Sequence, residues 1–133
     1  MAEKKKVLVV DDELNIRLLV KIMISNSYDV LEAGNGDEAL IKAREEKPDL
    51  ILLDIMMPGK DGFTTCNELK SSKATRDIPV VMLTALQHQL NEKLALSLNA
   101  DGYIRKPFTS RDILTTLDSV LFVKAQLEEV LLP

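Results

Sequence analysis

Several residue types and patterns that define common protein classes are missing from this sequence of 133 residues. Cys66 is the only cysteine, so an intrachain disulfide is excluded and a reducing compartment is expected. No apolar run approaches the roughly 20 residues that a membrane-spanning helix needs. The charged N-terminus lacks the pattern of a secretory signal. We therefore expect a cytoplasmic protein that does not associate with membranes.

Basic charge, histidine and glycine-rich segments are scarce as well. The net charge of -4 argues against direct nucleic-acid binding, because such surfaces need a basic excess. His88 is the only histidine, so a zinc site is not expected. No glycine-rich phosphate loop is present, which excludes the common nucleotide-binding fingerprints.

Short apolar segments alternate with longer amphipathic ones along the chain. The spacing predicts strands at residues 7–10, 29–33, 50–53, 79–83 and 102–104. It predicts helices at residues 15–25, 36–46, 62–69, 90–98 and 110–129. Two of the strand segments show no polar alternation, which is typical of strands buried on both faces. The fold class is therefore α/β, a doubly wound five-stranded parallel sheet with five helices.

Polar side chains follow four of the predicted strands at the point where each strand ends. They are Asp11 and Asp12 after the first strand, Asp54 after the third, Thr84 after the fourth and Lys106 after the fifth. Ligands of doubly wound proteins bind outside the carboxyl ends of the strands, so we expect these side chains to converge. Singly, Asp12 and Thr84 could be helix caps and Asp54 a turn residue. Lys106 alone could be an exposed lysine. None of these single-residue interpretations explains why all of the polar side chains are expected at the same edge of the sheet.

Three carboxylates in one partly buried pocket repel one another unless a cation lies among them. Oxygen ligands suit Mg²⁺, which accepts one or two carboxylates together with a phosphate oxygen. A carboxylate nucleophile, a hydroxyl and a lysine beside Mg²⁺ are the groups that aspartyl-phosphate chemistry uses. The sequence therefore predicts a magnesium-dependent phosphorylation site.

The motifs around these residues closely resemble the CheY-like receiver domain of bacterial two-component response regulators. The matching segments are VLVVDDE, PDLILLDIMMPGKDG, PVVMLTA and GYIRKPF, in this order. The resemblance runs from about Lys5 to Leu121 and implies a flavodoxin-like strand order, 2-1-3-4-5. We expect a receiver domain at residues 1–121 and an extension of the last helix at residues 122–133.

The resemblance also implies roles for the residues at the strand ends. Asp54 matches the phosphoacceptor, which receives a phosphoryl group from a histidine of a sensor kinase. Asp11 and Asp12 match the acidic pair that binds Mg²⁺ together with Asp54 and the backbone carbonyl of Met56. Lys106 matches the lysine that pairs with the phosphoryl group.

Further matched positions belong to the conformational switch of the family. Thr84 matches the hydroxyl that turns toward the phosphoryl group, and Tyr103 matches the aromatic whose rotamer follows it. The resemblance implies that the face formed by the fourth helix and fifth strand then changes. Pro107 matches a proline that often follows a cis peptide bond in this family.

The first predicted helix is more apolar than one buried face requires. A core stripe is predicted at Ile16, Leu19, Val20, Met23 and Ile24. A second stripe consists of Leu14, Leu18 and Ile22. It either packs against the last helix or forms a partner groove. The resemblance favours docking of a histidine kinase or phosphotransfer protein here, beside Pro107 and Phe108.

The last predicted helix is long, and apolar residues recur along it at heptad spacing. They are Ile113, Val120, Val123, Leu127 and Val130, with Thr116 as the exception. This pattern is open to three interpretations: a helix lying on its own domain, a homodimer contact, or a connector to an output domain.

A phosphoryl-accepting signalling switch is the leading functional hypothesis, with catalysis limited to its own phosphorylation and dephosphorylation. The alternative is a Mg²⁺-dependent aspartyl-phosphate phosphatase or phosphotransferase. The segment VVDDE lacks the Asp-x-Asp spacing usual there, and no cap-domain insertion is present. A flavin carrier is disfavoured because three acidic residues occupy the first turn, where a phosphate needs uncharged amides.

Overall fold

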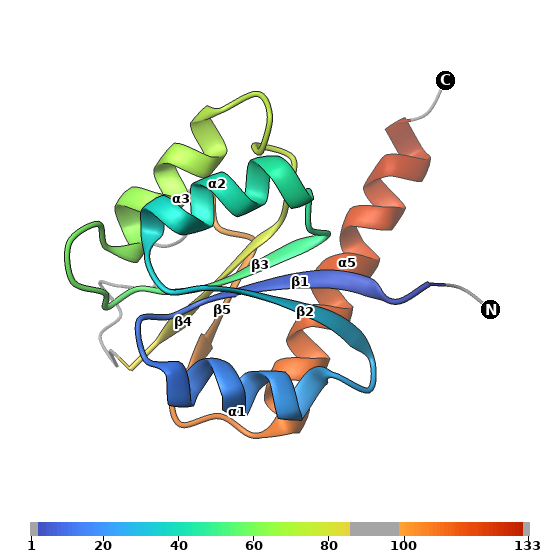
Figure 1. The fold of residues 1–133 in the computed structure, drawn as a ribbon. Helices are drawn as coiled ribbons and strands as arrows, with labels where there is room; N and C mark the ends of the chain where they lie inside the picture. Colours follow the sequence, from blue (N-terminus) through green and yellow to red (C-terminus); the bar gives the residue numbers. More distant parts are fainter. Residues whose placement is uncertain (1–2, 86–98, 132–133) are drawn as a thin grey trace.

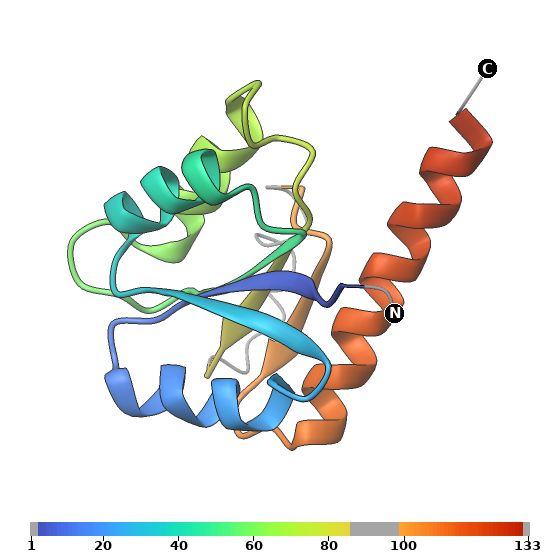
Figure 2. The ribbon, with the colours of Figure 1, turned by 45° about the vertical axis from the view of Figure 1, so that its right-hand side comes forward.

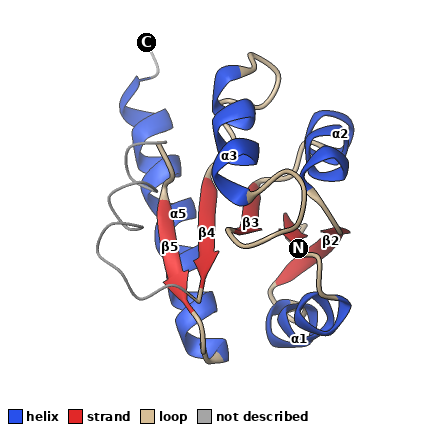
Figure 3. Cartoon of the chain, turned by 90° about the vertical axis from the view of Figure 1, so that its left-hand side faces the viewer, coloured by secondary structure: helices blue, strands red, loops and turns tan. Residues whose placement is uncertain are grey.

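Five parallel strands form one sheet in the computed structural model, which describes residues 3–85 and 99–131. The strands are β1 (Lys5–Val10), β2 (Tyr28–Ala33), β3 (Leu50–Asp54), β4 (Val80–Thr84) and β5 (Gly102–Arg105). Their order is β2-β1-β3-β4-β5, and every neighbouring pair is parallel. Figure 3 shows β5, β4 and β3 side by side. The predicted sheet and strand order are confirmed.

Four helices flank this sheet in the described ranges. They are α1 (Leu14–Ile24), α2 (Gly36–Glu46), α3 (Gly62–Ser71) and α5 (Ser110–Leu131). The helices α1 and α5 cover one face and α2 and α3 the other (Figure 1). The helix predicted at residues 90–98 lies outside the described residues. The strand order reverses between β1 and β3, so the carboxyl ends of these two strands flank the crevice where such folds bind ligands.

The central strands are buried on both sides, as their uniform hydrophobicity predicts. Alternate residues of one strand point to opposite faces of the sheet. In β3, Ile51 and Leu53 pack toward α2 and α3, whereas Leu50 and Leu52 pack toward α1 and α5. Two apolar layers of this kind hold the strand ends in fixed positions, and they therefore also hold the polar residues that follow the strands.

Strand β1 and helix α5 are longer than predicted. Strand β1 begins at Lys5 because the exposed Lys5 and Lys6 pair with Tyr28 and Asp29 of β2. These ladder hydrogen bonds come from the backbone, so the hydropathy of the side chains could not predict them. Helix α5 continues to Leu131, two residues beyond the predicted end.

Helix α1 exposes more apolar surface than predicted. Leu19, predicted in the core stripe, is 42% exposed, because it points about 100° away from the fully buried Val20. The second stripe, Leu14, Leu18 and Ile22, is exposed along its whole length. Packing of α1 against α5 therefore does not bury the second stripe.

Helix α5 belongs to the core only in its first half. Ile113 and Leu117 are fully buried against the sheet, so Ile113 is a core residue and not part of a free heptad stripe. The Tyr28 hydroxyl donates a hydrogen bond to the Asp118 carboxylate, which fixes α5 to β2. Val123 and Leu127 are exposed, and Figure 2 shows α5 extending past the sheet. The second half of α5 therefore leaves an apolar surface open.

Candidate functional site

Two predicted metal ligands are buried at the carboxyl ends of neighbouring strands. Asp54 is the last residue of β3, Asp11 follows β1, and both are at most 3% exposed. The pairing of Val10 with Leu53 brings these two strand ends together. Asp12 is exposed, but its carboxylate and those of Asp11 and Asp54 each offer an oxygen within 4.8 Å of the others.

Lys106 lies between the two buried carboxylates. Its Nζ is 3.3 Å from Asp54 Oδ1 and 3.4 Å from Asp11 Oδ2. Its backbone N–H donates to the carbonyl of Thr84 at 2.7 Å, which holds the residue at the end of β4. The peptide bond between Lys106 and Pro107 is cis. Lys106 is therefore an ion-paired residue of the site and not an exposed lysine.

The site carries more negative than positive charge. Burial and then the neighbouring Asp11 charge raise the pKa of Asp54 to about 6, although Lys106 and a hydrogen bond from the Met56 backbone act in the opposite direction. Burial lowers the pKa of Lys106, but the Asp54 and Asp11 charges outweigh it and the pKa is raised. One ammonium group thus pairs with two of the three clustered carboxylates. A divalent cation with hard oxygen ligands fits this donor set.

The Asp11 carboxylate is oriented by the backbone of the next turn. Its Oδ1 accepts a hydrogen bond from the Glu13 N–H at 2.9 Å, and the Asp11 N–H donates to the Ala33 carbonyl at 3.1 Å. Glu13 is the N-cap residue of α1, and its side chain makes no capping bond. The interpretation of Asp12 as the helix cap is therefore wrong, because the chain enters α1 one residue later.

The loop between β3 and α3 folds back onto the strand end that carries Asp54. The Gly62 N–H donates to the Ile55 carbonyl at 2.9 Å. A Cβ at Gly62 would lie 2.3 Å from the Asp54 carbonyl oxygen and 2.6 Å from the Ile55 Cα. Asp61 caps α3 by accepting from the Thr64 N–H at 2.8 Å. Because Gly62 has no side chain, the start of α3 can lie this close to the backbone of Asp54 and Ile55.

Replacing Gly62 by alanine is expected to destabilise the fold, because the added methyl group meets backbone atoms that cannot rotate away. Overpacking of this kind costs about 1–3 kcal/mol, and a backbone clash belongs at the upper end. Urea denaturation measures the change. Gly34→Ala is the matched control, since a Cβ there would be 3.5 Å from its nearest neighbour, Arg17 Nη1, which is an ordinary van der Waals contact. Equal stability of the two variants would contradict the close approach.

The two predicted switch residues lie on adjacent strands. Thr84 is buried at the end of β4, one strand away from Asp54. Tyr103 lies on β5, pairs in register with Met82, and is 36% exposed. Its side chain lines a shallow hollow with Pro107 and Arg111. Thr84 is thus next to the acidic site, while Tyr103 faces the surface of β5 and α5.

Sequence reasoning missed Arg17, which directly contacts Asp11 just beyond the end of β1. Its Nη1 donates to the Asp11 carbonyl at 2.6 Å, and its Nε donates to Glu32 Oε1 at 3.1 Å. A signal was present in the sequence. Arg17 is a cation in the first turn of a helix, where the helix dipole disfavours positive charge.

The sequence and the fold both match those of known proteins. The profile of the response regulator receiver domain family matches residues 7–118. The chemotaxis protein CheY4 of Vibrio cholerae has a similar structure, with a TM-score of 0.84 and 32% identity over 89% of this chain and 99% of that chain. A CheY-like receiver domain from Methanospirillum hungatei has a TM-score of 0.86 and 27% identity over 93% and 98% of the two chains. The chain belongs to the response regulator receiver domain family.

Curated relatives include transcriptional regulators. The alkaline phosphatase synthesis transcriptional regulatory protein PhoP of Bacillus subtilis is 44% identical over 88% of this chain and 48% of its own length. The transcriptional regulatory protein ResD of Bacillus subtilis is 43% identical over 87% and 48%. The chain thus spans about half the length of the curated relatives it matches. These matches do not favour the phosphatase alternative. No helix in the described ranges is long and apolar enough to cross a membrane.

Proposed function

We propose that this chain is a phosphoryl-accepting switch of a two-component system in the cytoplasm. Asp54 attacks the phosphorus of a phosphohistidine on a sensor kinase or phosphotransfer protein. A bond forms between phosphorus and the carboxylate oxygen as the bond to the histidine nitrogen breaks, and the histidine is released. The observation that carries this proposal is the clustering of the buried Asp54 with Asp11 at one sheet edge, where Lys106 pairs with both carboxylates.

Each residue of the site has a distinct part in this proposal. Asp11, Asp12, Asp54 and the Met56 carbonyl hold Mg²⁺, which when bound neutralises charge on the phosphoryl oxygens. Lys106 supplies a fixed positive charge to the same oxygens. The chain catalyses only its own phosphorylation and dephosphorylation and acts on no other substrate.

We further propose that phosphorylation changes the surface around β5. Thr84 turns toward the new phosphoryl group, and Tyr103 moves into the space that Thr84 leaves. The buried position of Thr84 beside the site and the exposed position of Tyr103 on the next strand support this order of events.

Incubation with acetyl phosphate and Mg²⁺ followed by intact-protein mass spectrometry tests the proposal. We expect the mass to increase by one phosphoryl group, and we expect the increase to disappear when a chelator removes the metal. No adduct in the presence of Mg²⁺, or an unchanged adduct with the chelator, would contradict the proposed site.

The second stripe of α1, formed by Leu14, Leu18 and Ile22, is proposed as the docking surface for the kinase or phosphotransfer protein. Ile22 is 76% exposed, and such apolar stripes rimmed by polar residues mark interfaces. Phe108 packs onto the same core layer as α1, so the segment with Pro107 and Phe108 lies on this side of the sheet (Figure 1).

Replacing Leu18 and Ile22 by serine is expected to slow phosphotransfer from the kinase by about tenfold or more, since interface hot spots exceed about 1–2 kcal/mol each. Phosphorylation by acetyl phosphate should stay unchanged because α1 still packs through its buried side. Ile41→Ser is the control, as Ile41 is an exposed apolar residue on α2. Equal losses with both phosphoryl donors would show that the stripe is structural.

The extension at residues 122–133 is proposed to be either a homodimer contact or a connector to an output segment, attached to a receiver domain at residues 1–121. Val123, Leu127 and Val130 are exposed along one side of α5 at heptad spacing. Sedimentation velocity with and without phosphorylation distinguishes the two: a dimer contact gives a concentration-dependent increase in mass, and a connector gives a monomer throughout.

A further inference from the structure

The network around Arg17 joins three secondary-structure elements beside the acidic site. Arg17 lies in the first turn of α1, its Nη1 holds the Asp11 carbonyl at the end of β1, and its Nε holds Glu32 on β2. The guanidinium side chain is only 17% exposed. The planar guanidinium group donates from two nitrogens in a fixed geometry, so it fixes its two acceptors relative to each other. A lysine ammonium on its flexible stem would not do so.

The position of Arg17 is unfavourable for the helix that carries it. The first turn of α1 contains no acidic residue, and Glu13 makes no side-chain cap. A cation there opposes the partial positive charge of the helix N-terminus. Helix stability therefore does not explain Arg17, whereas its two hydrogen-bonded acceptors do.

The carbonyl that Arg17 holds belongs to the same residue as a proposed metal ligand. Asp11 lies just beyond β1, where the strand no longer fixes the backbone on both sides. Its N–H is bonded to Ala33 and its carboxylate to the Glu13 N–H, and Arg17 holds the remaining backbone polar group. Rotation of the peptide unit after Asp11 would break the Arg17 bond and move the Glu13 N–H that orients the carboxylate.

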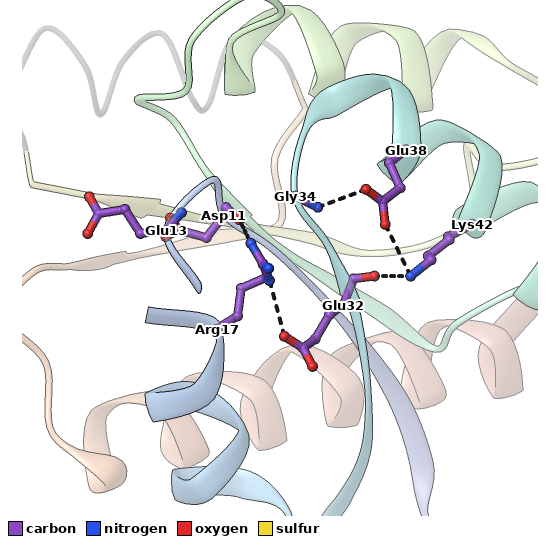
Figure 4. Close-up of polar contacts among 7 residues, drawn as sticks. All are labelled: Asp11, Glu13, Arg17, Glu32, Gly34, Glu38 and Lys42. Atoms are coloured by element: carbon purple, nitrogen blue, oxygen red, sulfur yellow. Dashed lines mark hydrogen bonds and ion pairs between the residues drawn. The ribbon is translucent and has the colours of Figure 1, made fainter. Parts of the chain in front are cut away.

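A second set of contacts holds Glu32 in place (Figure 4). Lys42 on α2 donates to the Glu32 carbonyl and forms an ion pair with Glu38 at 3.3 Å. Glu38 in turn accepts from the Gly34 N–H at 3.2 Å. The end of β2, from which the Glu32 side chain reaches Arg17, is thus fastened to α2.

We infer that Arg17 is a positioning residue that, with Glu32, fixes the Asp11 carboxylate in the orientation that binds the divalent cation. The inference rests on the proposed function, because it assigns Arg17 a role toward the same metal site. Arg17 bonds the Asp11 carbonyl and not its carboxylate, so it acts on the metal ligand through the Asp11 backbone.

The sign of a change in Mg²⁺ affinity separates positioning from charge. Removing a cation near a Mg²⁺ site by Arg17→Ala should tighten binding if charge alone matters, because like charges repel. A positioning role gives the opposite result, a loss of roughly tenfold, as found for outer partners of metal ligands. Isothermal titration calorimetry with MgCl₂ on the full chain measures the affinity.

Lys21→Ala is the matched control, since Lys21 is an exposed cation on the same helix away from Asp11. We expect its Mg²⁺ affinity to stay within about twofold of the wild type. Glu32→Ala, which leaves α1 unchanged, should weaken binding in the same direction as Arg17→Ala but by less. Equal or tighter binding by Arg17→Ala would overturn the inference whatever Glu32→Ala does, because loss of the Glu32 charge alone also weakens binding. A wild-type chain that binds no Mg²⁺ would instead overturn the proposed function.

Amide hydrogen exchange in metal-free buffer provides a readout that a general loss of stability would not mimic. In Arg17→Ala, the Glu13 N–H should exchange at least several-fold faster, while core amides such as that of Leu52 keep their protection. Uniformly faster exchange at both amides would show that Arg17 only stabilises the fold and would overturn the inference.

Discussion

Replacing Lys106 by methionine is expected to slow phosphorylation of Asp54 by about 100-fold to 1,000-fold, the usual effect of removing one group that stabilises charge in a transition state. Methionine keeps much of the length and apolar stem of lysine but removes the ammonium that lies within 3.4 Å of both Asp54 and Asp11. The rate with acetyl phosphate, followed by mass spectrometry, measures the loss.

The same substitution should change the protonation of Asp54. Lys106 lowers the pKa of this carboxyl, so its removal raises the pKa further above about 6 and leaves less carboxylate at neutral pH. Lys70→Met is the control because Lys70 pairs with Asp101 next to the amino end of β5, whereas the acidic site lies at the carboxyl ends of the strands. A rate for Lys106→Met within threefold of the control would contradict the role of Lys106.

Replacing Asp54 by asparagine is expected to stabilise the metal-free protein at neutral pH. The pKa of Asp54 is raised from 3.8 to about 6, so folding favours its protonated form. The folding free energy gained from protonation of Asp54 is fully present below about pH 4 and is lost as the pH rises through about 6. Above that range the buried charge costs roughly 2–3 kcal/mol, which asparagine, neutral and of the same shape, removes.

Urea denaturation in the presence of a chelator checks this expectation at neutral pH and near pH 4. Asp54→Asn should be more stable than the wild type at neutral pH, and the difference should shrink at the lower pH. Asp29→Asn is the control because Asp29 is an exposed carboxylate on β2. A lower free energy of unfolding for Asp54→Asn than for the wild type at neutral pH would show that the buried Asp54 charge does not destabilise the fold.

The sequence predicts the acidic site because two simple rules coincide there. Hydropathy places the ends of the strands, and parallel topology brings these ends together, so the pattern alone predicts that Asp11, Asp54 and Lys106 lie close to one another. The predicted convergence is present in the structure at distances of 3.3 and 3.4 Å from the lysine. Their roles in phosphoryl transfer stay predictions.

The features that the sequence does not predict depend on backbone contacts or on packing between elements. Lys5 and Lys6 extend β1 through ladder bonds that leave no trace in hydropathy. Leu19 is as apolar as its buried neighbours, and its exposure follows only from how α1 lies on the sheet. Gly62 approaches the Asp54 carbonyl closely, and Arg17 donates to the Asp11 carbonyl. Every residue carries a backbone carbonyl, so composition and spacing cannot identify which carbonyl is contacted.

The phosphoacceptor itself can be identified by comparing Asp54→Asn with Asp29→Asn after incubation with acetyl phosphate and Mg²⁺. Because Asp54→Asn is expected to fold at least as stably as the wild type, a lost adduct cannot be attributed to unfolding. We expect a phosphoryl adduct on the wild type and on Asp29→Asn and none on Asp54→Asn. An adduct of equal yield on Asp54→Asn would show that a residue other than Asp54 accepts the phosphoryl group.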